Sequence, residues 1–303
     1  MRLCAVSVDL DEIPNYFQIH GLSPGGAAAT AVYDVAIERL LSLSQHARVP
    51  LTLFAVGRDL ERPESAARLR DAFAAGCEIA NHSLDHFYDL TKRPREEIRA
   101  QIAGGAQAIE RAVGTAPVGF RAPGYTVTDE VFDVLAELGV SYDSSVFPCP
   151  AYYAAKTAAI ALYAARGRPS RSVIDTPSVL RAPTRPYFVG RPYYTRGEGL
   201  LELPIQVTRG LRLPFIGTSV TLAGADRARL LARMCVGEPL VNLELHGIDV
   251  LDASDGLEAL RPHQPDVRVA HARKLDALSA VIDVLRGEGY AFVTMRDAAA
   301  AFV

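Results

Sequence analysis

The chain has 303 residues, of which 49% are hydrophobic, so it can bury a large core, and α/β barrels of this length commonly form one domain. Its formal net charge of −3 and its pI near 6.2 give no global basic field, which argues against nucleic acid as a partner. No apolar run reaches the roughly 18 uncharged residues that a membrane-spanning helix needs.

Two further features concern the compartment. No basic segment followed by a long apolar stretch and a small-residue cleavage site precedes the first apolar run, so we expect a cytoplasmic protein. The four cysteines are scattered, without a CxxC pair, which favours reduced core thiols over a zinc–thiolate site or a disulfide framework. They are Cys4, Cys77, Cys149 and Cys235.

The first half of the chain predicts alternating strands and helices. The expected strands have short apolar β-type runs, and the expected helices have apolar residues at helical spacing. In chain order these are a strand at 3–8, a helix at 29–43, a strand at 51–56, a helix at 64–74, a strand at 78–80, a helix at 94–113, a strand at 118–120, a helix at 129–138 and a strand at 140–142. Repeated strand–helix units imply parallel strands.

From about residue 147 to 221 this rhythm stops, and the segment is rich in Pro, Tyr and Arg. We interpret it as a large insertion. Strands are predicted within it at 200–207 and 216–222, and after it come a helix at 226–234, a strand at 240–245, a helix at 271–285, a strand at 291–294 and a last short helix. A single catalytic domain over residues 1–303, built as a barrel of seven or eight βα units, fits best. An open doubly wound sheet is the alternative, but neither a GxGxxG after the first strand nor a Walker motif is present.

Reactive side chains follow four of the predicted strands. In a βα barrel the catalytic groups lie where strands end, so these side chains should meet at one mouth. The segments are residues 9–11 (DLD), 81–86 (NHSLDH), 121–125 (RAPGY) and 246–247 (HG).

His82 and His86 are four residues apart, which on one helical turn places both imidazoles on the same face. With a carboxylate they form a two-histidine, one-carboxylate set that leaves metal positions open. Zn²⁺ is the first choice, although iron, Co²⁺, Ni²⁺ or Mn²⁺ also suit these ligands. Taken alone, the spacing is more often a surface or capping pair of histidines, so the prediction depends on the neighbouring segments.

Asp9 and Asp11 flank one residue of an extended segment, so their side chains point the same way. One can bind the metal while the other faces a water molecule. The ordinary alternative is that one of them caps the following turn. Glu12, next to them, is expected to be structural.

Together the motifs resemble the polysaccharide deacetylase family, also called the NodB homology domain or carbohydrate esterase family 4. Residues 7–12 (SVDLDE), 81–86 (NHSLDH), 121–125 (RAPGY), 142–145 (YDSS) and 243–247 (LELHG) resemble its five motifs in order. The first is in the variant with one residue between the aspartates, which resembles cytoplasmic deformylases and deacetylases of lipid-linked amino sugars. The resemblance implies a distorted (β/α)7 TIM-like barrel, in agreement with the predicted elements.

The resemblance also implies roles for individual residues. Asp11, His82 and His86 would bind the metal, which polarises the acyl oxygen and the attacking water. Asp9 would be the general base and His246 the general acid. Further positions would be Arg121 as the partner of Asp9, the backbone N–H of Tyr125 as an oxyanion donor, Pro123 and Gly124 beside the substrate, and Asp143 as the candidate partner of His246.

The chain departs from the family in having no Trp, so other residues must form the wall of the substrate pocket, and the role of Asp143 stays open. His20, His46, His263 and His271 match no motif. Of these, His20 is the best candidate for substrate binding, because it follows the first strand.

The insertion bears on the substrate. Residues 151–165 are almost wholly apolar, and they are followed by Arg166, Arg168, Arg171, Arg181, Arg185, Arg191 and Arg196. One hypothesis is a lipid-linked, anionic amino sugar, with the apolar segment in peripheral contact with a membrane. The alternative is an ordinary buried helix with solvated arginines.

The predicted activity is removal of an N-acyl group, acetyl first, from an amino sugar or glycoconjugate precursor. A deformylase is one alternative, and a noncatalytic carbohydrate-binding barrel is another. All six motif residues that the chemistry requires are present, which favours an enzyme: Asp9, Asp11, His82, His86, Arg121 and His246. The oligomeric state is open.

Overall fold

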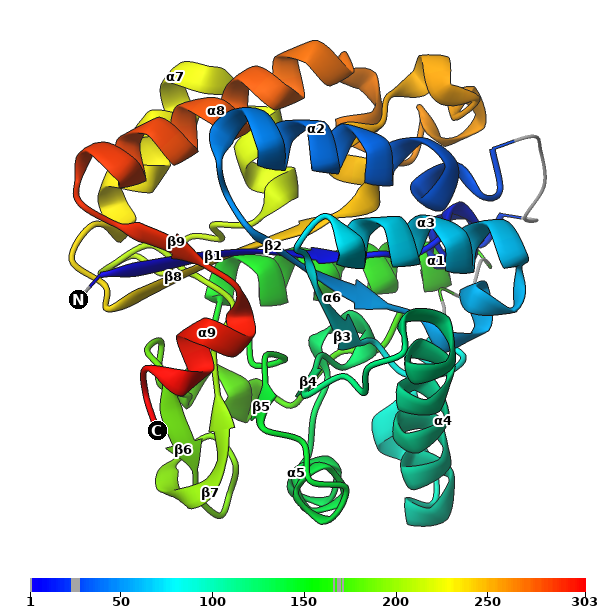
Figure 1. Ribbon diagram of the computed structural model, residues 1–303, viewed down its shortest axis with the longest axis vertical. Coiled ribbons are helices and arrows are strands. Elements are labelled where there is room, and N and C mark those ends of the chain that lie inside the picture. Colours follow the sequence, from blue (N-terminus) through cyan, green and yellow to red (C-terminus); the bar gives the residue numbers. More distant parts are fainter. Residues whose placement is uncertain (1, 23–27, 166, 168–169, 171) are drawn as a thin grey trace.

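In the computed structural model, which describes residues 2–22, 28–165, 167, 170 and 172–303, the strands form one curled sheet inside a layer of helices (Figure 1). The order along the sheet is β6-β7-β5-β4-β3-β2-β1-β8, with β9 also paired to β1. The pairs are parallel except β6 with β7. The strands are β1 Leu3–Asp9, β2 Leu51–Ala55, β3 Glu78–Asn81, β4 Gly119–Phe120, β5 Tyr142–Asp143, β6 Tyr187–Val189, β7 Arg196–Glu202, β8 Leu240–His246 and β9 Ala291–Val293.

The helices that follow the strands cover the outer face of the sheet. Figure 1 shows α2, α7 and α8 side by side over one part of it, with α3 and α4 over the next. The helices are α1 Ile13–Ile19, α2 Ile37–Ala47, α3 Pro63–Ala74, α4 Arg95–Val113, α5 Asp129–Glu137, α6 Pro150–Ala165, α7 Gly217–Cys235, α8 His271–Gly287 and α9 Met295–Ala300. Across the described part of the chain, none of them is long and apolar enough to cross a lipid bilayer.

The barrel closes through a loop. Between β7 and β8 the chain after β7 lies in the gap, where the N–H of Gln206 donates to the carbonyl of Asn242 at 3.1 Å. The Asn242 amide in turn donates to the carbonyls of Leu203 and Pro204. These contacts satisfy backbone groups that a further strand would otherwise pair. The predicted distorted barrel is therefore confirmed.

Parallel strands covered on both faces are expected to be mostly apolar, and β1 and β2 follow this rule except at Ser7, Asp9 and Thr52, whose side chains form hydrogen bonds. All seven residues of β1 and all five of β2 are buried. The four cysteines are free and buried, as predicted.

The insertion contains the main errors of the sequence prediction. Residues 216–222 are not a strand, because α7 begins at Gly217 and the hydroxyl of Ser219 accepts from the N–H of Ile216 at its start. The β-branched residues there suggested a strand, and Gly224, whose backbone is not helical, separates them from the rest of α7. The strand predicted at 200–207 begins earlier and ends at Glu202, and helix α1 and strand β6 were not predicted.

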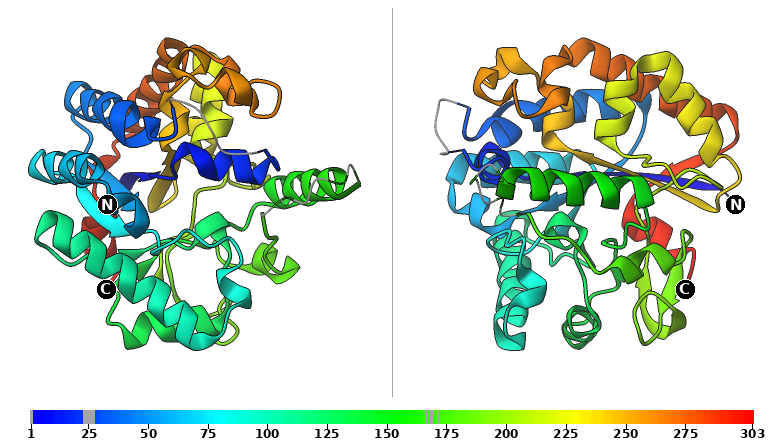
Figure 2. Two further views of the ribbon diagram at one scale, coloured as in Figure 1. Left: turned by 90° about the vertical axis from the view of Figure 1, so that its right-hand side faces the viewer. Right: turned by 180° about the vertical axis from the view of Figure 1, so that it is seen from behind.

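The apolar segment 151–165 does form a helix, α6, but none of its residues is buried. In Figure 2 it projects from the barrel on the side opposite α3. The interpretation as an ordinary buried helix is therefore wrong.

The carboxylate of Glu12 joins two helix beginnings. It accepts from the backbone N–H groups of Ile13 (3.2 Å), Val32 (3.2 Å) and Tyr33 (3.1 Å). The last two belong to a π-helix, Val32–Ala36, a rare form that is frequent at functional sites. Glu12 thus fixes the path of the chain after Asp11.

Candidate active site

The polar residues predicted to meet do so at the carboxyl ends of the strands. In the sheet register Asp9 lies opposite His246 of β8, and Asn81, next to His82, lies opposite Phe120, next to Arg121. Neighbouring parallel strands therefore deliver these side chains to the same end of the barrel.

Asp11, His82 and His86 form the candidate metal site. The Nε2 atoms of the two histidines lie 3.2 and 3.1 Å from the Asp11 carboxylate oxygens and 3.2 Å from each other. The histidines come together through an irregular loop rather than the expected helical turn, since Ser83 (φ 68°) and His86 (φ 53°) both have left-handed backbones. Although burial alone would raise the pKa of Asp11, the two imidazoles hold it well below its usual value.

The donor set fits a divalent cation. The backbone carbonyl of Arg121 lies 2.7 Å from His82 Nδ1 and must accept its proton, so the Nε2 lone pair of the neutral ring points at the site. Asp11 Oδ1 is buried without a hydrogen-bond partner, as is Asp9 Oδ2, which lies 3.8 Å from His82 Nε2. Two unpartnered carboxylate oxygens beside the His82 lone pair are costly unless a positive charge lies between them.

Asp9 is held by Arg121, as the sequence predicted. Arg121 is fully buried, and its Nη1 donates to Asp9 Oδ1 at 2.7 Å. The rest of the guanidinium donates to the Ser144 carbonyl, the Ser144 hydroxyl and the Ser7 hydroxyl at 2.8–2.9 Å, and its carbon lies 4.1 Å from the centre of the Phe54 ring. One oxygen of Asp9 is thereby fixed, and the other faces the cavity.

The partner of His246 is Glu244, not Asp143. Glu244 Oε1 lies 3.0 Å from His246 Nδ1, whereas the Asp143 carboxylate accepts from the N–H and hydroxyl of Ser145. Burial would lower the pKa of His246, but Glu244 outweighs it and raises that pKa well above its usual value. Glu244 and His246 are two apart on one strand, which places both side chains on the same face, so the LELH sequence already held this signal.

Tyr125 lies beside His246, with its hydroxyl 3.3 Å from His246 Nε2. Gly124 and Tyr125 both have positive φ (62° and 59°), which makes the sharp turn expected at this position. The N–H of Tyr125, expected to be an oxyanion donor, donates to the Ala122 carbonyl at 3.1 Å in this structure. Pro123 is buried in the same turn and is not among the residues that line the cavity.

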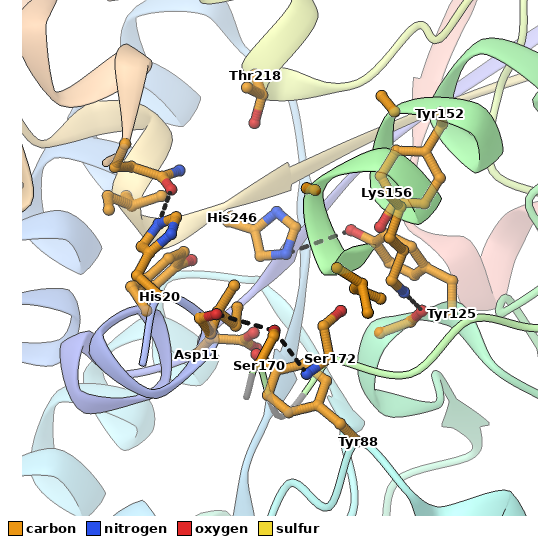
Figure 3. Close-up of a pocket in the computed structure, with 18 of the residues that line it drawn as sticks. Asp11, His20, Tyr88, Tyr125, Tyr152, Lys156, Ser170, Ser172, Thr218 and His246 are labelled. Carbon is orange, nitrogen blue, oxygen red and sulfur yellow. Dashed lines mark hydrogen bonds between the residues drawn. The ribbon is translucent and has the colours of Figure 1, made fainter. Parts of the chain in front are cut away.

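A cavity of about 380 Å³ opens over these groups (Figure 3). Five tyrosines line the cavity and form an aromatic wall in this chain, which has no Trp: Tyr16, Tyr88, Tyr125, Tyr152 and Tyr163. His20 lines it as well, with Nδ1 2.8 Å from the Tyr163 hydroxyl and Nε2 2.9 Å from Gln264 Oε1. His20 is thus placed at the cavity, as predicted, although its ring nitrogens are engaged by the protein.

The sequence did not identify the residues that α6 contributes. Tyr152, Lys156 and Tyr163 recur at helical spacing on one face of α6, and that face lines the cavity. The segment was apolar enough to suggest a helix, but nothing in it indicated which part of the barrel that helix would approach.

The arginines of the insertion do not reach the cavity among the residues described. Arg185 pairs with Glu238 and Arg191 with Asp133, both away from the cavity. Arg166, Arg168 and Arg171 lie outside the described residues.

Comparisons with known proteins find a family match over part of the chain. The family model described as polysaccharide deacetylase matches residues 31–142. A curated peptidoglycan deacetylase of Helicobacter pylori is 25% identical over 151 residues, which cover 48% of this chain and 49% of the relative. The match therefore spans about half the length of that relative.

Solved structures resemble nearly the whole chain. A candidate polysaccharide deacetylase of Mycobacterium smegmatis has a TM-score of 0.54 at 22% identity, covering 97% of this chain and 93% of its own. The CE4 domain of a multidomain xylanase from the hindgut metagenome of Trinervitermes trinervoides has a TM-score of 0.51 at 16% identity, and the match covers 98% of this chain and 88% of that domain's chain. A CE4 pseudoenzyme of Bacillus anthracis has a TM-score of 0.51 at 13% identity, and the match covers 98% of this chain and 64% of the pseudoenzyme's chain. At these identities the likeness shows the fold alone.

Proposed function

We propose that this chain, whose residues 31–142 match the polysaccharide deacetylase family model, is a metal-dependent hydrolase that removes an N-acyl group, acetyl first, from an amino sugar. The observation that carries the proposal is the pair of carboxylates at the end of β1. Asp11 lies between two imidazoles, and Asp9, anchored by Arg121, keeps one oxygen free toward the cavity. Such a pair separates metal binding from proton transfer.

Each residue has a role in this chemistry. A divalent cation held by Asp11, His82 and His86, Zn²⁺ by first choice, would polarise the acyl oxygen and the attacking water. Asp9 accepts the water proton through its free oxygen, while Arg121 keeps its carboxylate in place. His246, charged through its contact with Glu244, donates a proton from Nε2 to the departing amine.

The substrate we propose is an N-acylated amino sugar of a precursor or small glycoconjugate. Tyrosines are suited to it because their rings pack on the apolar faces of a sugar while their hydroxyls bind its polar groups. Lipid linkage, membrane contact through the exposed apolar residues of α6, and a cytoplasmic location stay predictions. Leu162 of α6, 49% exposed, is the residue whose substitution by Asp would weaken binding to anionic vesicles.

The first experiment is metal analysis of the purified protein, with assays of acetate and formate release from N-acyl amino sugars and sugar nucleotides, with and without chelator. We expect about one metal per chain and release that the chelator abolishes. His82→Ala should lose the metal, whereas Asp9→Asn should keep it and lose activity. His46→Ala is the matched control, since His46 is exposed and, among the described residues, its side chain forms hydrogen bonds with Ser42 of the same helix.

The acid released decides between a deacetylase and a deformylase. A wild-type protein that takes up no Zn²⁺, Co²⁺, Ni²⁺ or Mn²⁺ on reconstitution would overturn the metal site. A protein that binds metal and sugar but releases no acid would instead be the noncatalytic barrel.

A further inference from the structure

Lys156 is a cation in the wall of the cavity to which the proposed chemistry gives no role. It lies on the inner face of α6, and its amine donates to the carbonyl of Gly124 at 2.9 Å. Of the described residues that line the cavity, Lys156 alone has an amine or a guanidinium. An ammonium group has three donors, and among the described residues this one makes a single hydrogen bond.

The amine is connected to the metal ligand His86 through Gly124 and Tyr88. A Cβ placed on Gly124 would be 3.5 Å from Lys156 Nζ and 3.0 Å from Tyr88 Cδ1, so the amine and the Tyr88 ring border the same small space. The Tyr88 ring packs edge-on against His86, with 4.8 Å between ring centres. Figure 3 shows Lys156 reaching down from α6 on the same side of the cavity as Tyr125. A group bound beside the metal site would therefore meet this amine.

The surroundings of the amine are poor in water and in countercharge. Although part of the Lys156 side chain is exposed, protein atoms around its amine bury that group and lower its pKa to about 8, and Asp175 opposes that shift. Asp175 is itself engaged by the Tyr193 hydroxyl and the N–H of Thr176. The Tyr152 ring, 5.6 Å from the amine, adds only a weak attraction. A desolvated ammonium with unused donors gains most from an anionic oxygen.

We propose that Lys156 is a specificity-determining residue that binds a carboxylate of the substrate close to its N-acyl group. One ammonium carries one positive charge, which matches the single negative charge of a carboxylate, whereas a phosphate monoester carries a charge of about −1.5 to −2 at pH 7 and would be only partly neutralised. The inference rests on the proposed function for the position of the acyl group at the metal site. It narrows the substrate from amino sugars in general to acidic N-acyl amino sugars.

The test uses two ligands, N-acetylmuramic acid and its methyl ester, which differ in the negative charge and in one methyl group. Their affinities are measured by calorimetry on the metal-loaded protein at pH 7. We expect the wild type to prefer the acid by about tenfold, the size of one charge-assisted hydrogen bond. Lys156→Met should bind both ligands equally, and Lys156→Arg should keep part of the preference. The preference should also fade as the pH rises above about 8, because the amine loses its charge.

Tyr163→Phe is the matched control. It removes a contact of α6, the hydroxyl beside His20 Nδ1, without changing the charge of the cavity. If Lys156 served only to attach α6, both Lys156→Met and Tyr163→Phe would weaken acid and ester alike, and this result would overturn the inference. Equal binding of acid and ester by the wild type would also overturn it and leave the proposed function standing. Binding of neither ligand would refute it together with the proposed class of substrate.

Discussion

The floor and the roof of the cavity are built in different ways. The floor consists of Asp9, Asp11, His82, His86 and Arg121, which are all buried at the strand ends. The roof is α6, which has no buried residue. The roof is held by polar contacts from Lys156 to the Gly124 carbonyl and between Tyr163 and His20, and by the packing of Tyr152 and Tyr153 on hydrophobic clusters. The groups that break a bond are thus fixed within the barrel, while part of the substrate pocket is formed by a helix that lies outside it.

The largest effect should come from the floor. Arg121→Met removes four donated hydrogen bonds and leaves the buried Asp9 carboxylate unpaired. We expect a loss of about 3–5 kcal/mol in the free energy of unfolding, measured by urea denaturation, together with loss of activity. The control is Arg58→Met. Arg58 forms ion pairs with Asp85 and Glu61, but its side chain is 53% exposed. The change should therefore lower the free energy of unfolding by about 1 kcal/mol or less. Similar losses in both variants would contradict the distinction between floor and surface.

The next effect concerns His246 and appears in the pH profile. Burial lowers the pKa of His246, but the Glu244 carboxylate raises it by more, so His246 is protonated at neutral pH. Activity that needs this proton therefore falls as the pH rises through the raised pKa. Glu244→Gln removes the carboxylate, so the alkaline limb of kcat/KM should move to lower pH by about one unit or more. Asp143→Asn should leave the limb in place, because Asp143 contacts Ser145 and not His246. If the alkaline limb moved in Asp143→Asn and not in Glu244→Gln, Asp143 would be the partner of His246, as the sequence suggested.

The smallest effect should come from the roof. Tyr163→Phe removes one hydrogen bond at a partly buried position, so it should cost about 1 kcal/mol or less in unfolding. It should raise KM more than it lowers kcat, since α6 meets the substrate and not the reacting water. A variant with unchanged KM and lowered kcat would show that the roof takes part in the chemistry.

The sequence predicted the floor well because its information is local. Strands β1, β3 and β8 read as apolar runs, and the reactive residues follow each of them directly, so the barrel rule alone brings Asp11, His82 and His246 together. The ion pair of Asp9 with Arg121 followed from the family resemblance, and the structure places their atoms 2.7 Å apart.

The roof could not be predicted in the same way. Which face of α6 turns inward depends on how the insertion returns to the barrel, and no repeated pattern of residues 147–221 encodes that path. The error at 216–222 has a related cause, since local β-propensity there is overruled by the start of α7. Asp143 was taken as the candidate partner of His246 in place of Glu244, because the family resemblance was given more weight than the two-residue spacing of Glu244 and His246 on β8.

Strand β1 joins the earliest part of the chain to the latest. It pairs with β2, β8 and β9, and the Ser7 hydroxyl donates to Asn242, 235 positions away. Contacts so distant incur a large loop-closure entropy before burial compensates for it, which slows folding. During synthesis, β1 can pair with β2 early, but it cannot pair with β8 until β8 has left the ribosome. Until then β1 presents an open apolar edge, so the nascent chain, more than the finished protein, is the form at risk of aggregation.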